Sequence, residues 1–280
     1  MRRILCLHGH GTSADIFQAQ TASFRAKLGP DYSFDFVNAP HPSPGAPGIE
    51  AIFRNSTTYT WYTHPTPEAI CAAHDWVITY TREHGPYEAV CCFSQGCALA
   101  STLALYHAHN SPPIEPLPFR AAIFICGGVP LPALADLGLP VSPRAHEINR
   151  STGALLQATA GRLSTFAADP KQIQRGVGLW DHLVESPDLL VRDPARRPDR
   201  QDVFGLDFTQ FPAWATIRIP TVHIYGSKDP RWPAGIQLAE FCPDRVEYDH
   251  GGGHDIPRTT GVSTKIASLV EQVLRRVGEE

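Results

Sequence analysis

The sequence predicts an α/β protein with a mostly parallel central sheet and helices on both of its faces. Short apolar runs alternate with amphipathic runs along most of the chain, as expected for repeated strand–helix–strand units. One apolar run, 90–93, passes through a turn of small residues directly into a helix-forming run. The length of 280 residues suits one domain, 1–280, that buries a sizeable core.

The first third of the chain predicts two strands and two helices in alternation. The second helix has a clear start, because Thr66 can cap it and Pro67 fits its first turn. Between the two units, 38–48 contains too many prolines for regular structure. The expected strands are 4–7 and 32–37, and the expected helices are 13–28 and 66–85.

The rest of the chain continues the pattern, with one interruption. From about 127 to 215 the alternation breaks down, and we expect a lid or cap insertion that carries a helix over 152–168. After it come two strands and a last helix whose apolar residues recur at core spacing. The remaining expected elements are strands at 119–126, 220–226 and 245–250, and a helix over 262–277.

Composition excludes several classes of partner. The formal net charge of −4 and a pI of about 6.3 give no sign of nucleic acid or an anionic membrane as partner. No apolar run is long enough to span a bilayer, and Met1 is followed directly by core sequence with no signal peptide. Several of the seven cysteines fall in apolar strand runs. We therefore expect a reduced, cytoplasmic protein that needs no cofactor and no metal.

Ser94 lies where the run 90–93 turns into the next helix. A serine raised on such a strand–turn–helix elbow is the usual nucleophile of an α/β-hydrolase, so this fold is expected. The positions two residues away must be small; Gly96 fits, whereas Cys92 departs from the usual glycine. The alternative is an exposed serine that only caps the helix.

Asp229 and His254 complete a candidate triad in the chain order serine, acid, histidine. Asp229 follows the expected strand 220–226, and His254 follows a run of three glycines after the strand 245–250. His254 would take the proton of Ser94, and Asp229 would orient the imidazole and stabilise its charged form.

Each partner of Ser94 has rivals in the sequence. Asp249 and Asp255 flank the histidine but lie too close to it along the chain to face it from another strand end. Asp207 is a weaker alternative acid because it precedes the last strands. His250 competes with His254, but it ends a strand and lacks the preceding glycines.

The first strand runs into an His-Gly-His-Gly turn, where such enzymes place an oxyanion donor. We expect the backbone N–H groups of His10 and Gln95 to form the oxyanion hole. His8 is expected only to hold the turn by hydrogen bonds. A metal site built from His8, His10 and His254 fits no zinc spacing and is disfavoured.

Aromatic residues near the expected cleft could line an acyl pocket. Trp61 and Tyr62 follow the proline-rich loop. The aromatic candidates within the insertion are Phe166, Trp180, Phe204, Phe208, Phe211 and Trp214. Ile256 follows the histidine loop. The alternative for each of these residues is ordinary core packing.

Several segments resemble the fungal FSH1-type serine hydrolase family over nearly the whole chain, most weakly between about 130 and 200. Cys92 departs from that pattern, and so does Asp255, where the family often has an aromatic residue. The resemblance implies an α/β-hydrolase whose triad falls on Ser94, Asp229 and His254. The segments that carry it are 4–13, 93–96, 203–207, 219–226 and 252–257.

Many members of that family lie in fungal secondary-metabolite clusters and resemble thioesterases that release a polyketide from its synthase. The resemblance therefore implies an enzyme acting on a hydrophobic acyl thioester or ester, with an acyl carrier protein as possible partner. The product would be an acid or a lactone. The alternatives are a short-chain carboxylesterase without a synthase partner, and a catalytically silent hydrolase that binds a small molecule.

Overall fold

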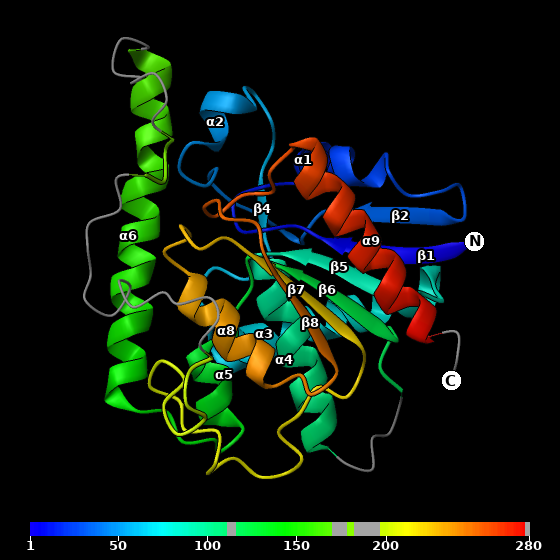
Figure 1. Cartoon of the computed structure of the whole chain (residues 1–280), viewed down its shortest axis with the longest axis vertical. Coiled ribbons are helices and arrows are strands. Elements are labelled where there is room, and N and C mark those ends of the chain that lie inside the picture. The colour runs from blue at the N-terminus through cyan, green and yellow to red at the C-terminus, as the bar shows by residue number, and fades with distance from the viewer. Residues whose placement is uncertain (111–115, 170–177, 182–196, 278–280) are drawn as a thin grey trace.

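A computed structural model describes residues 1–110, 116–169, 178–181 and 197–277 of the chain (Figure 1). Its centre is a sheet of six strands in the order β2-β1-β5-β6-β7-β8, and every neighbouring pair is parallel. The parallel sheet expected from the sequence is confirmed. The strands are β1 (Arg2–Leu7), β2 (Tyr32–Val37), β5 (Ala89–Phe93), β6 (Ala121–Ile125), β7 (Thr221–Tyr225) and β8 (Arg245–Asp249).

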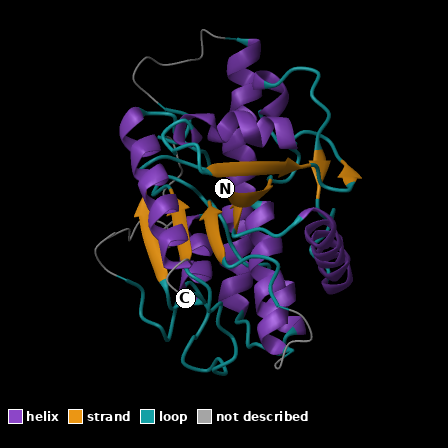
Figure 2. Cartoon of the chain, turned by 90° about the vertical axis from the view of Figure 1, so that its right-hand side faces the viewer, coloured by secondary structure: helices purple, strands orange, loops and turns teal. Residues whose placement is uncertain are grey.

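Helices cover both faces of this sheet, as the sequence predicts (Figure 2). The helices α1 (Ala14–Arg25) and α9 (Thr260–Val277) contribute to one hydrophobic cluster. The opposite cluster is built from α3 (Pro67–His84), α4 (Gln95–His109), α5 (Leu131–Asp136) and α8 (Trp232–Glu240).

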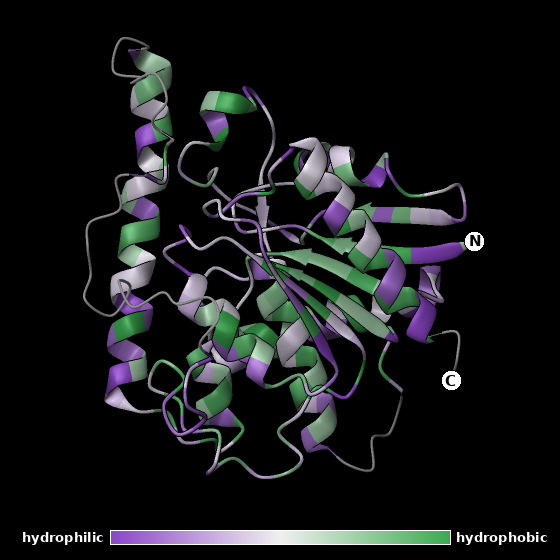
Figure 3. Cartoon of the chain, viewed as in Figure 1, coloured by the Kyte–Doolittle hydropathy of each residue, from purple (hydrophilic) through white to green (hydrophobic). Residues whose placement is uncertain are grey.

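The central strands separate these two clusters by simple alternation. Cys91 and Cys92 are both buried, but the first belongs to the α1–α9 side and the second to the α3–α4 side. Strands buried on both faces are apolar throughout, and Figure 3 colours β5 and β6 as hydrophobic. The core therefore fixes the carboxyl ends of the strands, where loops carry the polar side chains.

Two helices differ from the sequence-based expectation. The helix α1 ends at Arg25 rather than at 28, because residues 26–28 form a tighter turn in which Leu28 N–H donates to Arg25 O. The helix α6 (Pro143–Ala168) begins well before 152, since Ser142 caps it by accepting from Ala145 N–H at 3.1 Å. The start of α3 after Thr66 is as predicted.

The segment from about 127 to 215, where the sequence predicts a lid or cap, lies between β6 and β7 and contains α5 and α6. In Figure 1 the long helix α6 stands beyond the carboxyl ends of the strands. It meets the short helix α2 (Ile49–Ile52), and a Cβ on Gly48 would lie 2.7 Å from the Leu163 side chain. The strands on either side of α2 in the chain, β3 (His41–Pro42) and β4 (Tyr59–Thr60), form a two-stranded antiparallel ribbon. Parts of the insertion, 170–177 and 182–196, lie outside the described residues.

None of the helices in the described ranges combines the length and apolar character that crossing a bilayer requires.

The buried His223 in β7 makes stability depend on pH. Burial lowers its pKa to about 3, and its Nε2 lies 3.0 Å from Thr221 Oγ1. The unfolded chain binds this proton below about pH 6.5, whereas the folded protein resists it until about pH 3. The stability contribution is therefore complete above the unfolded pKa and is lost progressively as pH falls from there. We expect the Tm of wild type to fall between pH 7 and 4.

Thermal unfolding of His223→Gln tests this expectation. Glutamine does not titrate, so the unfolded variant binds one proton fewer than unfolded wild type in acid. The Tm of this variant should therefore fall less steeply with acidification. His41→Gln, at an exposed position, is the control and should follow wild type. Equal slopes for His223→Gln and wild type would contradict the assignment.

Candidate active site

Ser94 sits on a strained turn between β5 and α4. Its backbone has φ 52° and ψ −109°, a region that costs a residue other than glycine about 1–3 kcal/mol. Gly96 allows the close approach behind it, because a Cβ there would lie 2.2 Å from Leu7 O. Cys92 stands where such a turn usually has glycine. It is fully buried, and its side chain is small enough for the strand and the helix to approach each other. The elbow expected from the sequence is formed.

Three side chains from distant parts of the chain form one hydrogen-bonded series. His254 Nε2 lies 3.0 Å from Ser94 Oγ, and His254 Nδ1 lies 2.7 Å from Asp229 Oδ2. The Asp229 side chain is 1% exposed and that of His254 is 11% exposed. A hydroxyl, an imidazole and a buried carboxylate in this order can activate the hydroxyl as a nucleophile.

The loop after β7 holds Asp229 in place. Its second oxygen, Oδ1, accepts from the Arg231 N–H at 2.7 Å. The Arg231 side chain reaches away to α6, donating to Asn149 O at 2.7 Å and to Thr152 Oγ1 at 2.8 Å. The carboxylate is thus fixed from both sides, and its loop is tied to the insertion.

The rival side chains have other partners. Asp249 Oδ1 accepts from the backbone N–H of Ser227 and of Gly251, and Asp207 accepts from Thr209 and Gln210. His250 Nδ1 accepts from the Gly252 N–H at 3.1 Å. Asp255 borders the site, and burial raises its pKa. The structure brings Asp229 and His254, rather than these four, to Ser94.

The two residues expected to form the oxyanion hole are linked through a third. His10 Nδ1 and Gln95 Oε1 each lie 3.0 Å from Thr60 Oγ1. Gln95 Nε2 also donates to Tyr62 O at 2.8 Å. Gln95 begins α4, so its backbone N–H has no acceptor within the helix and is available to a ligand. Sequence reasoning missed Thr60, whose role depends on a two-residue strand that no pattern marks.

His8 holds the turn, as expected. It is fully buried, its Nδ1 lies 3.1 Å from Thr12 Oγ1, and its Nε2 accepts from the Ala39 N–H at 3.0 Å. Burial lowers its pKa to about 4, so the imidazole stays neutral near pH 7. Because both ring nitrogens already have protein partners, His8 is not placed to ligate a metal together with His10 and His254.

A cavity of about 500 Å³ opens at Ser94 and His254. One wall is the 46–52 segment, which packs against the first turn because Gly11, at φ 61°, approaches the Ala46 backbone closely. Another wall is formed by α6. The lining is largely apolar, and its apolar side chains are Ala46, Pro47, Ile49, Ile52, Phe93, Leu156, Ala160, Leu163, Leu179 and Trp180.

Of the expected pocket residues Trp180 does line this cavity, whereas five others do not. Trp61 is fully buried and donates from Nε1 to His8 O at 2.9 Å, and Tyr62 is buried beside it. Phe204 packs on Trp232, Phe208 packs on Phe241, and Ile256 packs against the α1–α9 cluster. All five stabilise the body of the protein, which is the usual fate of large apolar side chains.

The real lining left a signal in the sequence. Leu156, Ala160 and Leu163 recur at helical spacing within the predicted 152–168 helix, and in the structure they face the cavity. The wall formed by 46–52 has no such signal in the sequence, because this irregular segment is positioned by its contact with Gly11.

The fold together with the linked serine, histidine and aspartate is that of serine hydrolases of the α/β-hydrolase class. Residues 1–266 match the family that is described as serine hydrolase (FSH1). The chain therefore belongs to this family. The resemblance noted in the sequence is thereby confirmed.

Known proteins agree with this membership. Esterase FPY3 of Fusarium mangiferae is 29% identical over 279 residues, covering 98% of this chain and 97% of its own. The dihydromonacolin L-[lovastatin nonaketide synthase] thioesterase of Aspergillus terreus is 33% identical over 121 residues, covering 38% of this chain and 47% of its own. A solved arylesterase shares the fold with a TM-score of 0.50 and 10% identity, over 99% of this chain and 76% of that one.

Proposed function

We propose that the protein is an acyl esterase or thioesterase that works through an acyl-enzyme on a hydrophobic chain. The observation that carries this proposal is that Ser94 and His254 line a largely apolar cavity of about 500 Å³. That volume lies within the range of small-molecule sites and suits an extended acyl group.

In the first half-reaction Ser94 Oγ attacks the carbonyl carbon of the substrate. His254 Nε2, 3.0 Å away, takes the hydroxyl proton, and Asp229 stabilises the resulting imidazolium. The backbone N–H groups of His10 and Gln95 bind the oxyanion. His254 then gives its proton to the leaving thiol or alcohol, leaving an ester on Ser94.

In the second half-reaction an acceptor hydroxyl attacks this ester. His254 removes its proton and returns it to Ser94 Oγ as the bond to the enzyme breaks. Water as acceptor gives an acid, and a hydroxyl of the bound chain gives a lactone. The apolar lining of α6 and 46–52 favours acyl groups that fold within the cavity.

We propose a polyketide-derived chain as the physiological acyl group and an acyl carrier protein as its donor. The likeness to the Aspergillus terreus thioesterase, whose name joins it to a nonaketide synthase, supports this choice over a short-chain carboxylesterase. The proposed reaction needs no metal and no cofactor.

Substrate comparison tests this function. Acyl N-acetylcysteamine thioesters and p-nitrophenyl esters of increasing chain length should show kcat/KM rising with length, with thioesters at least matching the esters. A preference confined to short p-nitrophenyl esters would instead favour the general carboxylesterase. A fluorophosphonate probe should label the protein, and absence of labelling would favour the silent binder.

Narrowing the cavity should change chain-length selectivity. Ala160→Trp places a large ring in the α6 wall, so kcat/KM for long acyl chains should fall by about 10–100-fold while short chains lose little. Ala168→Trp puts the same ring at an exposed position at the end of α6 and should behave as wild type. A uniform loss across all chain lengths would show that the ring disturbs catalysis and not the acyl site.

A further inference from the structure

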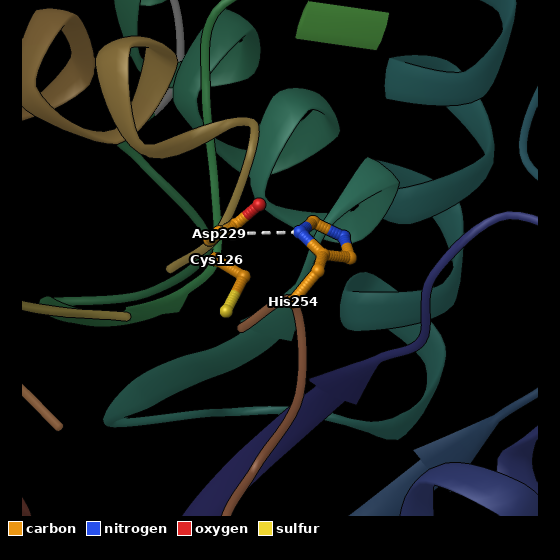
Figure 4. Close-up of side chains that lie close together, drawn as sticks. All are labelled: Cys126, Asp229 and His254. Atoms are coloured by element: carbon orange, nitrogen blue, oxygen red, sulfur yellow. Dashed lines mark hydrogen bonds and ion pairs between the residues drawn. The ribbon is translucent and has the colours of Figure 1, made fainter. Parts of the chain in front are cut away.

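A third potential ligand lies beside the Asp229–His254 pair. Cys126 follows β6 with φ 50°, and its side chain lies next to the Asp229–His254 pair, with the sulfur turned away from the hydrogen bond between them (Figure 4). One ligand atom from each of Cys126, Asp229 and His254 lies within 4.8 Å of the others. The three residues come from the loops after β6, β7 and β8, so the sheet itself brings them together.

The surroundings of the sulfur are rich in oxygen. Cys126 Sγ lies 3.6 Å from Asp255 O and 3.9 Å from Gly253 O, besides the nearby Asp229 carboxylate. A thiol has only one proton to offer to these acceptors. Such a concentration of sulfur, carboxylate and carbonyl groups would be stabilised by a cation.

We propose that a thiophilic divalent cation such as Zn²⁺ binds Cys126 Sγ, the Asp229 carboxylate and His254 Nδ1 and reversibly inhibits the enzyme. Sulfur, imidazole nitrogen and carboxylate oxygen are the ligands zinc prefers, and its bond lengths place neighbouring ligand atoms about 3.3–3.7 Å apart. The Asp229–His254 contact must widen from 2.7 Å by about 1 Å or less, and the sulfur, whose ligand neighbours lie within 4.8 Å, must move inward by up to about 1.5 Å. Water can supply the fourth ligand.

Binding of the cation inactivates His254, the proposed base, because it changes which ring nitrogen carries the proton. The free neutral imidazole carries its proton on Nδ1, toward Asp229, and accepts through Nε2. A cation on Nδ1 needs the lone pair there, so the ring proton moves to Nε2. The Cys126 thiol loses its proton to solvent, and one proton is released per ion. With Nε2 protonated, His254 cannot accept the Ser94 proton.

This site differs from the histidine cluster weighed from the sequence, and the ion is an inhibitor rather than a cofactor. His254 borders the cavity, whereas Cys126 and Asp229 are buried and do not line it, so the proposal requires the ion to enter past His254. The inhibitory half of the proposal rests on the proposed role of His254 in catalysis, whereas the binding half does not.

Cadmium reports binding without any turnover, because a cadmium–thiolate bond absorbs in the ultraviolet. The titration uses Cys71→Ala protein, since Cys71 is half-buried near acidic residues on α3 and could bind the probe itself. We expect one equivalent of Cd²⁺ to produce the band in Cys71→Ala and no band in Cys71→Ala/Cys126→Ser. A band that survives in the double variant, or its absence from Cys71→Ala, would overturn the site.

Zinc inhibition is measured on Cys71→Ala and on Cys71→Ala/Cys126→Ser, with thermal unfolding to confirm that both fold. The added Cys126→Ser change should raise the zinc concentration for half-inhibition at least about tenfold, because one of three protein ligands is lost. Chelation should restore activity, and Mg²⁺ should not inhibit because it avoids thiolate. Equal zinc sensitivity of the two proteins, or a cadmium band without inhibition by zinc, would refute inhibition through this site.

Discussion

Ser94→Ala is expected to lower kcat/KM for a long-chain acyl ester by about 10⁴-fold or more and to abolish labelling by a fluorophosphonate. The change removes the oxygen that forms the acyl-enzyme and leaves the cavity and the His254–Asp229 pair in place. Steady-state kinetics and in-gel fluorescence of the labelled protein give the two readouts.

A matched control separates chemistry from stability. Ser151→Ala alters an exposed serine on α6 and should leave labelling and turnover at wild-type levels. Ser94→Ala should also keep its fold, because alanine retains the Cβ and the same backbone conformation at this turn. Near-normal turnover of Ser94→Ala would end the assignment of the nucleophile.

Asp229→Asn is expected to lower kcat by about 10⁴-fold with little change in KM. The amide keeps the size of the side chain, and its oxygen can still accept from the Arg231 N–H. Its NH₂ group then faces His254 Nδ1 and stabilises the tautomer with the proton on Nε2. That tautomer cannot accept from Ser94.

Asp207→Asn is the control for this second result. Asp207 was the alternative acid in the sequence, and its carboxylate only accepts from Thr209 and Gln210 in an exposed turn. We expect normal kcat for Asp207→Asn. A loss as large as that of Asp229→Asn, or normal turnover of Asp229→Asn, would show that Asp229 is not the acid of the site.

The triad could be predicted because each member follows a strand with a strong local signature. Buried parallel strands read as apolar runs, and their carboxyl ends meet at one edge of the sheet. Ser94 comes directly after such a run and Asp229 follows a second one by four residues, whereas His254 follows the half-buried strand β8 and a glycine loop. Strand order and chain order together therefore bring the three residues to one place. Glycine spacing then selected His254 over His250.

The acyl cavity could not be predicted in the same way. The choice of Trp61 and Phe208 assumed that large apolar side chains near the cleft face the substrate, but burial in the core gains more and places them there. The true walls depend on tertiary contacts, as when Gly11 brings the 46–52 segment against the first turn. Such contacts join positions far apart in sequence and leave no periodic signal.

Arg231 has a practical consequence for anyone who wishes to redesign chain-length preference. Its backbone N–H donates a hydrogen bond to Asp229, and its guanidinium donates to Asn149 and Thr152 in the first half of α6. Substitutions in that half would therefore disturb Asp229 through Arg231 and lower the rate of proton transfer. Substitutions in the second half of the helix, from Leu156 onward, should alter specificity with the smallest loss of rate.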